Sequence, residues 1–100
     1  MSIEYIGTPR PPLSTNAAEC IIAKFDKFPE IVVLRKTTSE VGIALRTNEN
    51  AEHETATINI SPNRVYVGFH ACHRNQRELV LGYLTMVIKV KGSECELQEE

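Results

Sequence analysis

The feature that most constrains the fold of this chain is a stretch of alternating polar and apolar residues that a single turn interrupts. Residues 55–60 alternate with a period of two, and the alternation resumes over residues 65–70. This period is typical of a β-strand with one buried face. The residues between the two runs include Pro62 and Asn63, which suit the middle of a type I turn. The pattern therefore predicts a β-hairpin.

The turn also predicts which side chains of the hairpin share a face. If Ser61 lies opposite Arg64, every apolar side chain points to one side of the sheet. The cross-strand pairs on that side are Ile60–Val65, Ile58–Val67 and Ala56–Phe69. The other side carries polar and small residues and one aromatic residue, namely Thr55, Thr57, Asn59, Tyr66, Gly68 and His70. We expect the first side to face the core and the second to face solvent or a partner.

A long helix is predicted after the hairpin. Asn75 and Glu78 resemble a capping box, and apolar residues recur at helical spacing through residues 76–90. Gly92 then provides a stop signal. Leu81 and Met86 widen the apolar stripe, so we expect this helix to be largely buried against the sheet. Gly82, in its interior, indicates either a close approach to the sheet or a tolerated weakness.

Two further elements precede the hairpin. A first helix is predicted from Ser14 or Asn16 to a point before Pro29, with Ala18, Ile21, Ile22 and Phe25 on one face. Residues 31–36 and 41–46 read as a second hairpin. Pairing Lys36 with Val41 places Leu34 opposite Ile43 and Val32 opposite Leu45 on the core side. Its reverse side then holds Ile31, Val33, Arg35, Gly42, Ala44 and Arg46, so we expect the amino-terminal segment or a partner to cover that side.

These elements predict a single domain, 1–100, of the α+β class. We expect a two-layer fold, in which two helices pack on one face of an antiparallel sheet of four to five strands. The predicted order of elements is α-β-β-β-β-α-β. Residues 1–12 form an extended amino-terminal segment that could supply an edge strand. Cys95 and Leu97 alternate with glutamates and could form a last strand, and residues 98–100 are expected to fray as an acidic tail.

Composition excludes several classes of function. The chain is 42% hydrophobic and 24% charged, with a formal net charge of −2. This balance argues against a general nucleic-acid binder, which needs a basic stripe to neutralise phosphates. No apolar run is long enough to span a membrane, and the first residues do not resemble a signal peptide, so we expect a cytoplasmic protein without a membrane partner. The three cysteines, Cys20, Cys72 and Cys95, fit reduced thiols better than disulfides.

One cluster, His70-Ala71-Cys72-His73, has chemical potential. Two imidazoles and a thiolate could bind zinc, but a structural site needs four ligands and the usual spacings are lacking. Cys72 could act as a nucleophile beside His70 or His73 at the start of the helix. The third interpretation is a connecting loop with a packed cysteine. We predict no catalytic residue, metal or cofactor, and a small cysteine-dependent enzyme stays as an alternative.

The polar segment before the central hairpin concentrates glutamates. Clustered carboxylates attract basic partners and imitate a phosphate backbone, although a solvated loop is the simpler interpretation. The predicted partner-binding residues combine this loop with the polar side of the hairpin: Glu49, Glu52, Glu54, Thr57, Asn59, Tyr66 and His70.

In size, acidity and order of elements, the whole chain resembles the small α+β immunity proteins that bacteria pair with toxins. The resemblance is architectural and carries over no functional residue. It implies a protein without catalytic activity that binds and neutralises one cognate toxin, often a nuclease, and that is a monomer or homodimer when free. An acidic secretion chaperone for an effector, which would dimerise through an apolar helix or strand, is the alternative binding function.

Overall fold

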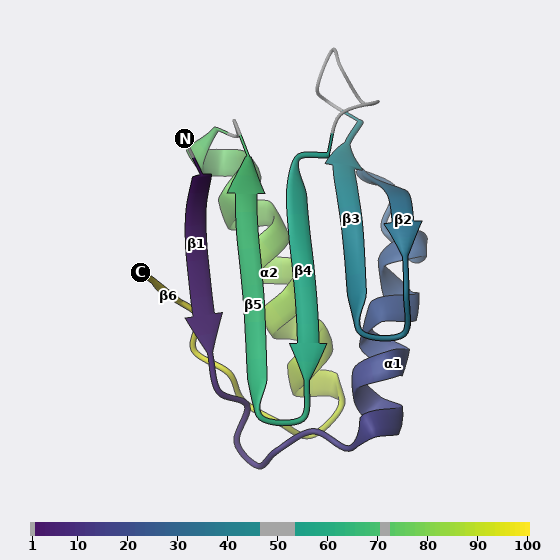
Figure 1. The fold of residues 1–100 in the computed structure, drawn as a ribbon, viewed down its shortest axis with the longest axis vertical. Coiled ribbons are helices and arrows are strands. Elements are labelled where there is room, and N and C mark those ends of the chain that lie inside the picture. The colour runs from purple at the N-terminus through teal and green to yellow at the C-terminus, as the bar shows by residue number, and fades with distance from the viewer. Residues whose placement is uncertain (1, 47–53, 71–72) are drawn as a thin grey trace.

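The fold is a six-stranded antiparallel sheet with two α-helices on one of its faces (Figure 1). The computed structural model describes residues 2–46, 54–70 and 73–100. The elements are β1 (Ser2–Gly7), α1 (Thr15–Lys24), β2 (Ile31–Lys36), β3 (Glu40–Leu45), β4 (Ala56–Ser61), β5 (Arg64–His70), α2 (Arg74–Val90) and β6 (Gln98–Glu99). A short 3₁₀ turn, Phe25–Lys27, follows α1. The α+β class and the antiparallel sheet are therefore confirmed.

The sheet has one strand more than the four to five predicted, and the order of elements begins with a strand rather than a helix. The strand order is β2-β3-β4-β5-β1-β6. The amino-terminal strand β1 lies inside the sheet, where Ile3 pairs with Phe69 and Tyr5 with Val67. The expected edge strand is thus an inner one. Because β1 lies in the plane of the sheet, it does not cover either face.

The central hairpin has the predicted register. Ser61 lies opposite Arg64, and Ser61 Oγ donates a hydrogen bond to the Arg64 carbonyl at 3.1 Å. The three predicted apolar pairs are all present. The residues predicted for the core face of β3, β4 and β5 are buried: Ile43, Leu45, Ile58, Ile60, Val65, Val67 and Phe69. Period-two alternation and turn chemistry were therefore sufficient to predict this part of the molecule.

The second hairpin differs from the prediction on one side of a β-bulge. Arg35 pairs with Gly42 and Lys36 with Val41, as expected, but the register shifts between Val33 and Arg35. The bulge turns Ile31 and Val33 toward the core and leaves Leu34 exposed. The predicted placement of Ile31 and Val33 on the reverse side, and of Val32 and Leu34 on the core side, is wrong. The extra residue reverses the facing of every residue before it.

The first helix is capped as its sequence predicts. Ser14 Oγ accepts a hydrogen bond from the Ala17 amide at 3.0 Å. Ala18, Ile21, Ile22 and Phe25 are all buried against the sheet.

The second helix begins at Arg74 rather than after a cap at Asn75. Its N-cap is His73, whose amide donates to Gln76 Oε1 at 3.0 Å. Gln76 therefore takes the role expected of Glu78. The helix ends before Gly92, whose φ of 86° lies in the left-handed region that favours glycine. Its inner face is buried as expected, but Met86 is exposed, so the predicted stripe is wider than the buried one.

The carboxyl-terminal segment closes the sheet beside β1. An added Cβ at Gly7 would lie 2.6 Å from both Cys95 Sγ and the Glu96 carbonyl oxygen, so glycine permits this close crossing. The last strand forms at Gln98 rather than at Cys95, and it pairs with Ile6. The short strand β6 thus lies within residues 98–100, the part of the chain for which we predicted fraying. Among the described helices, none has the length and apolar character to cross a membrane.

Candidate protein-binding face

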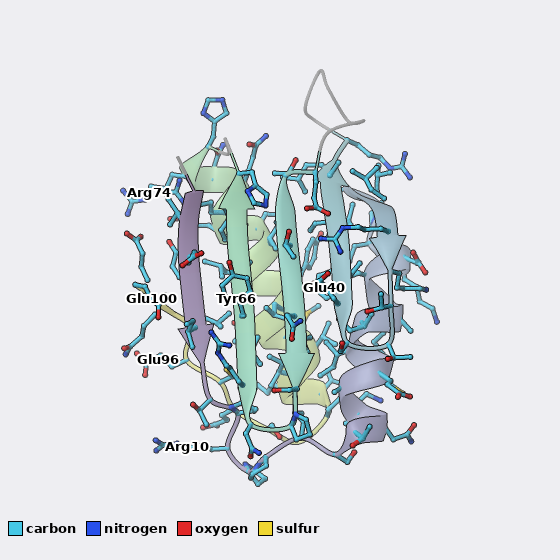
Figure 2. All side chains as sticks on the ribbon, viewed as in Figure 1. Arg10, Glu40, Tyr66, Arg74, Glu96 and Glu100 are labelled. Atoms are coloured by element: carbon cyan, nitrogen blue, oxygen red, sulfur yellow. The ribbon has the colours of Figure 1, made fainter. Side chains whose placement is uncertain are left out.

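The side of the sheet away from the helices carries a layer of polar side chains, here called the open face. Figure 1 shows both helices behind the sheet, and Figure 2 shows Glu40 and Tyr66 in front of it. The open face consists of Glu4, Arg35, Glu40, Glu54, Thr57, Asn59, Arg64, Tyr66 and His70. It gathers side chains from the five strands β1 to β5 and from Glu54, which precedes β4.

Arg35 is the centre of one half of the open face. Its Nε donates to Glu54 Oε1 at 2.7 Å and its Nη2 to Glu54 Oε2 at 3.3 Å, which makes a two-point contact with that carboxylate. The remaining Nη1 pairs with Glu40 Oε2. Arg35 is 47% exposed and Glu54 26% exposed. A planar guanidinium held by two carboxylates has little rotational freedom, so the geometry of this group is fixed before any partner arrives.

A glycine makes this arrangement possible. Gly42 lies opposite Arg35 in the sheet, and a Cβ added to it would stand 1.7 Å from Glu54 Oε1 and 2.9 Å from Arg35 Cγ. The carboxylate of Glu54 therefore lies over Gly42 of β3. Glycine inside a strand often marks such a close approach.

The ion pairs shift the pKa values of all three groups. Hydrogen bonds from Arg35 hold the pKa of Glu40 below its usual value. Partial burial works to raise the pKa of Glu54, but the hydrogen bonds from Arg35 and Thr57 outweigh it, so that pKa is also lowered. The same bonds to Glu54 and Glu40 raise the pKa of Arg35. The three side chains are therefore charged at neutral pH.

A second chain of contacts leads from Glu54 to β5. Thr57 Oγ1 donates to Glu54 Oε2 at 2.8 Å and lies 3.3 Å from His70 Nε2. His70 Nε2 is 3.9 Å from the same carboxylate oxygen. The residues Glu40, Arg35, Glu54, Thr57 and His70 thus form a continuous row across the sheet.

Thr57 lies at the centre of the contacts between Glu54 and His70. A threonine hydroxyl has one proton, and here that proton is directed at Glu54. Thr57 thus links the carboxylate of Glu54 to the imidazole of His70, whose Nε2 lies 3.3 Å from the same hydroxyl oxygen. The row is suited to holding charges in fixed positions.

Tyr66 dominates the other half of the open face. Its hydroxyl donates to Glu4 Oε1 at 3.0 Å, and the Arg64 guanidinium lies 5.7 Å from its ring centroid. A Cβ at Gly68 would come within 2.7 Å of the Tyr66 hydroxyl, so this ring also lies over a glycine. Partial burial and the bond to Glu4 raise the pKa of Tyr66, which keeps the phenol protonated.

The structure brings together most of the residues predicted to bind a partner. Glu54, Thr57 and His70 are in contact, while Asn59 lies between Glu40 and Tyr66 in cross-strand register. Asn59 also forms a hydrogen bond with Glu40. Glu49 and Glu52 lie outside the described residues, as does Cys72.

Four members of the open face were not among the residues predicted from the sequence: Glu4, Arg35, Glu40 and Arg64. The sequence feature that could have indicated these residues was indirect. Gly42 and Gly68 interrupt strands that are otherwise rich in branched residues, and each glycine accommodates a side chain that lies over it. The predicted pairing of Arg35 with Gly42 could have led to this side chain.

Other possible sites in the described part of the chain offer less chemistry. No group of three or more His, Cys, Asp or Glu side chains there is arranged to hold a metal. A shallow groove of about 1120 Å³ lies between α2 and the segment that contains Cys95. Burial raises the pKa of the Cys95 thiol, which disfavours the thiolate that a nucleophile requires.

Comparison of the chain with protein-family models, curated protein sequences and solved structures gives no match. The interpretation of the open face therefore depends on its own geometry.

Proposed function

We propose that this chain is a binding protein without catalytic activity, and that it engages a protein partner through the open face. The observation that carries the proposal is the row Glu40–Arg35–Glu54–Thr57–His70, whose members are partly exposed and already fixed by one another. Side chains that are ordered before binding lose less entropy when a partner docks. Charges in fixed positions also select a partner with the complementary pattern.

The composition of the open face suits a protein partner. Arginine and tyrosine are the residue types most often found at the energetic centre of protein interfaces, and Arg35 and Tyr66 stand on the two halves of this face. Both are flanked by polar groups whose hydrogen bonds are already made within the sheet. The face therefore resembles the polar, specific type of interface rather than an apolar assembly surface.

Within this class, we propose an immunity protein that neutralises a cognate bacterial toxin in the cytoplasm. The acidic character of the chain and its small α+β fold support this choice. A nuclease is a suitable target, because carboxylates such as Glu40 and Glu54 can occupy the place of substrate phosphates.

The test is affinity capture of the tagged protein coexpressed with its genomic neighbour. We expect one partner in a fixed ratio and protection of the cell from that partner. Arg64→Glu on the open face should reduce capture, whereas Lys27→Glu on the helix side is the matched charge reversal and should not. A partner that is captured equally by both variants would exclude the open face as the binding surface.

A secretion chaperone is the second candidate, and one observation favours it. Met86 and Val90 are exposed apolar side chains on α2, and chaperones of this kind are expected to dimerise through an apolar helix. Capture of a secreted effector rather than a toxin would select this function.

A further inference from the structure

The segment that leads into β6 follows the edge of β1 without completing the ladder between them. Glu94 exchanges both backbone hydrogen bonds with Arg10, at 2.8 and 2.9 Å. Further along, the Glu100 amide donates to the Glu4 carbonyl oxygen at 2.9 Å. Between these two points, residues 95–97 form no backbone hydrogen bond with any other described residue. Three consecutive residues therefore keep their N–H and C=O groups available for a ligand.

This unpaired stretch is held in place by packing. Cys95 is only 7% exposed, and its Sγ lies close to Gly7. Leu97 also packs against the core. Backbone groups near the core nearly always have a hydrogen-bond partner. The unpaired groups of this stretch therefore suit a ligand that supplies both donors and acceptors, and an extended peptide supplies them at the same repeat.

The groove of about 1120 Å³ runs between this stretch and α2. Cys95 and Leu97 line one side of it, and the other side is lined by Leu81, Gly82 and Met86. Among the described residues, no atom lies within 4 Å of the position that a Cβ of Gly82 would take. The glycine is therefore not explained by a close approach to the sheet, which was one expectation for it. Met86, one turn later, is 49% exposed, so the groove offers an apolar wall with space for a side chain at Gly82.

Two cations without a carboxylate partner lie at one end of the groove. Arg10 and Lys89 both line it and are both exposed. Neither side chain forms an ion pair or a hydrogen bond with the part of the chain that the structure describes. Glu94 is the acidic residue at this end, so positive charge is in excess there. At this end the chain leaves α2 and turns back toward β6 (Figure 1), and Figure 2 shows Arg10 at the same, lower end of the molecule.

We propose that the groove binds the carboxyl-terminal tail of a partner protein as an added β-strand. The segment that leads into β6 runs away from the two cations, so a strand antiparallel to it runs toward them. The backbone of the added strand pairs with residues 95–97, and its terminal carboxylate lies between Arg10 and Lys89. Gly82 lies seven residues before Lys89, about 10 Å along the helix, which is the span of about three strand residues. A side chain three positions before the terminus therefore enters the space at Gly82.

The groove and the open face are separate surfaces. The helix α2 lies behind the sheet, so the groove beside it is on the helix side, whereas the open face is in front (Figure 1). Backbone donors and acceptors, an apolar wall with a vacant position and an excess of positive charge at one end together select a peptide with a free carboxylate. The inference goes beyond the proposed function, because it holds whether or not a partner binds the open face.

The test is binding of the purified full chain to two arrays of random seven-residue peptides that are anchored by their amino termini. The arrays share the same sequences, but one has free terminal carboxylates and the other has terminal amides. We expect a subset of the sequences to bind, each at least about tenfold more tightly with the carboxylate than with the amide. No binding to the carboxylate array, or equal binding to both arrays, would overturn the proposal.

Variants of the protein test where a selected peptide lies. Gly82→Leu fills the vacant space at an exposed helical position, so it should keep the fold and weaken binding at least about tenfold. Lys27→Leu also adds a leucine at an exposed position but lies outside the groove, and it is the matched control. Lys89→Glu should weaken binding of the carboxylate peptide more than that of its amide. Equal affinity of wild type and Gly82→Leu would contradict binding in the groove.

Backbone pairing is tested on the peptide and on the protein. Methylating every second amide nitrogen of a selected peptide removes the strand donors on one edge and retains the side chains, so one of the two alternate sets should abolish binding. The amide protons of residues 95–97 should exchange more slowly when the peptide is bound. If both methylated peptides bind normally, the peptide is not an added strand. If Tyr66→Ala rather than Gly82→Leu loses the peptide, the site is the open face, and this inference fails while the proposed function stands.

Discussion

The two faces of β4 and β5 are made from alternate residues of the same strands, yet they are held by different forces. On the core side, Ile58 and Val67 face each other with no exposed surface. On the open face, Thr57 and Tyr66 make directed contacts with Glu54 and Glu4. Apolar burial depends on area and volume, whereas hydrogen bonds depend on the position of single atoms. The core side is therefore defined by a pattern, and the open face by individual neighbours.

This difference implies unequal tolerance to substitution. A polar group in the core loses its water without gaining a partner, and the free-energy cost is large. A polar group lost from the open face is replaced by water, because the row is partly exposed. The following predictions compare the two faces, beginning with the largest expected effect.

Adjacent residues of β5 provide the sharpest comparison. Val67→Asn places an amide in the core and should lower the free energy of unfolding by about 4 kcal/mol. Tyr66→Asn changes the next residue on the open face and should cost less than about 1.5 kcal/mol. Urea denaturation followed by circular dichroism measures both. Similar losses for the two variants would show that the faces are wrongly assigned.

Gly42 tests the close packing of the open face. In Gly42→Ala the new methyl group displaces the Glu54 carboxylate, and we expect a loss of about 1 kcal/mol in the free energy of unfolding. The same change at Gly82 meets open space in α2 and should stabilise the monomer by up to about 1 kcal/mol. Thermal unfolding at low protein concentration measures both. If Gly42→Ala were stabilising, Glu54 would not lie over β3.

The acidic groups of the open face predict a pH dependence. The pKa of Glu54 is lower in the folded protein than its ordinary value of 4.5, so its contribution is full above that pH and is lost as the pH falls through the folded value. Wild type should therefore exceed Glu54→Gln in stability at pH 7, and the gap should close on acidification. Denaturation curves at several pH values measure the gap. A gap that widens toward low pH would contradict the lowered pKa.

The hydroxyl of Thr57 gives the smallest effect. Thr57→Val keeps the branched shape but removes the contact to Glu54 and His70, and we expect a loss of about 0.5 kcal/mol in the free energy of unfolding. Thr57→Ser, which retains the hydroxyl, is the control for that contact in the same denaturation assay. A loss as large as that of Val67→Asn would mean that the row is a second core.

The difference between a pattern of residues and individual neighbours also explains which parts of the fold could be predicted from the sequence. The central hairpin could be predicted because its alternation and its turn independently specify one register. The bulge in β2 could not, because Ile31, Val32, Val33 and Leu34 are all apolar and either facing satisfies the pattern. The place of β1 inside the sheet could not be predicted either, because its pairing with β5 joins segments about sixty residues apart in the chain.

The candidate site was predicted only in part for a related reason. The polar side of the hairpin was visible in the sequence, and Thr57, Tyr66 and His70 lie there as expected. Arg35 and Glu54 come from distant segments, and their contact depends on the absence of a side chain at Gly42. Contacts of this kind are made by the tertiary fold and produce no periodic pattern in the local sequence.

The most direct test of the open face is the affinity of the captured partner for two tyrosine variants. Isothermal titration calorimetry should show that Tyr66→Ala weakens binding about thirtyfold, as expected for an aromatic residue central to an interface. Tyr83 is the matched control: it stacks on Phe28 in the helix layer, with ring centroids 4.0 Å apart. Tyr83→Ala should bind within about threefold of wild type. Unchanged affinity for Tyr66→Ala, or a loss confined to Tyr83→Ala, would contradict binding through the open face.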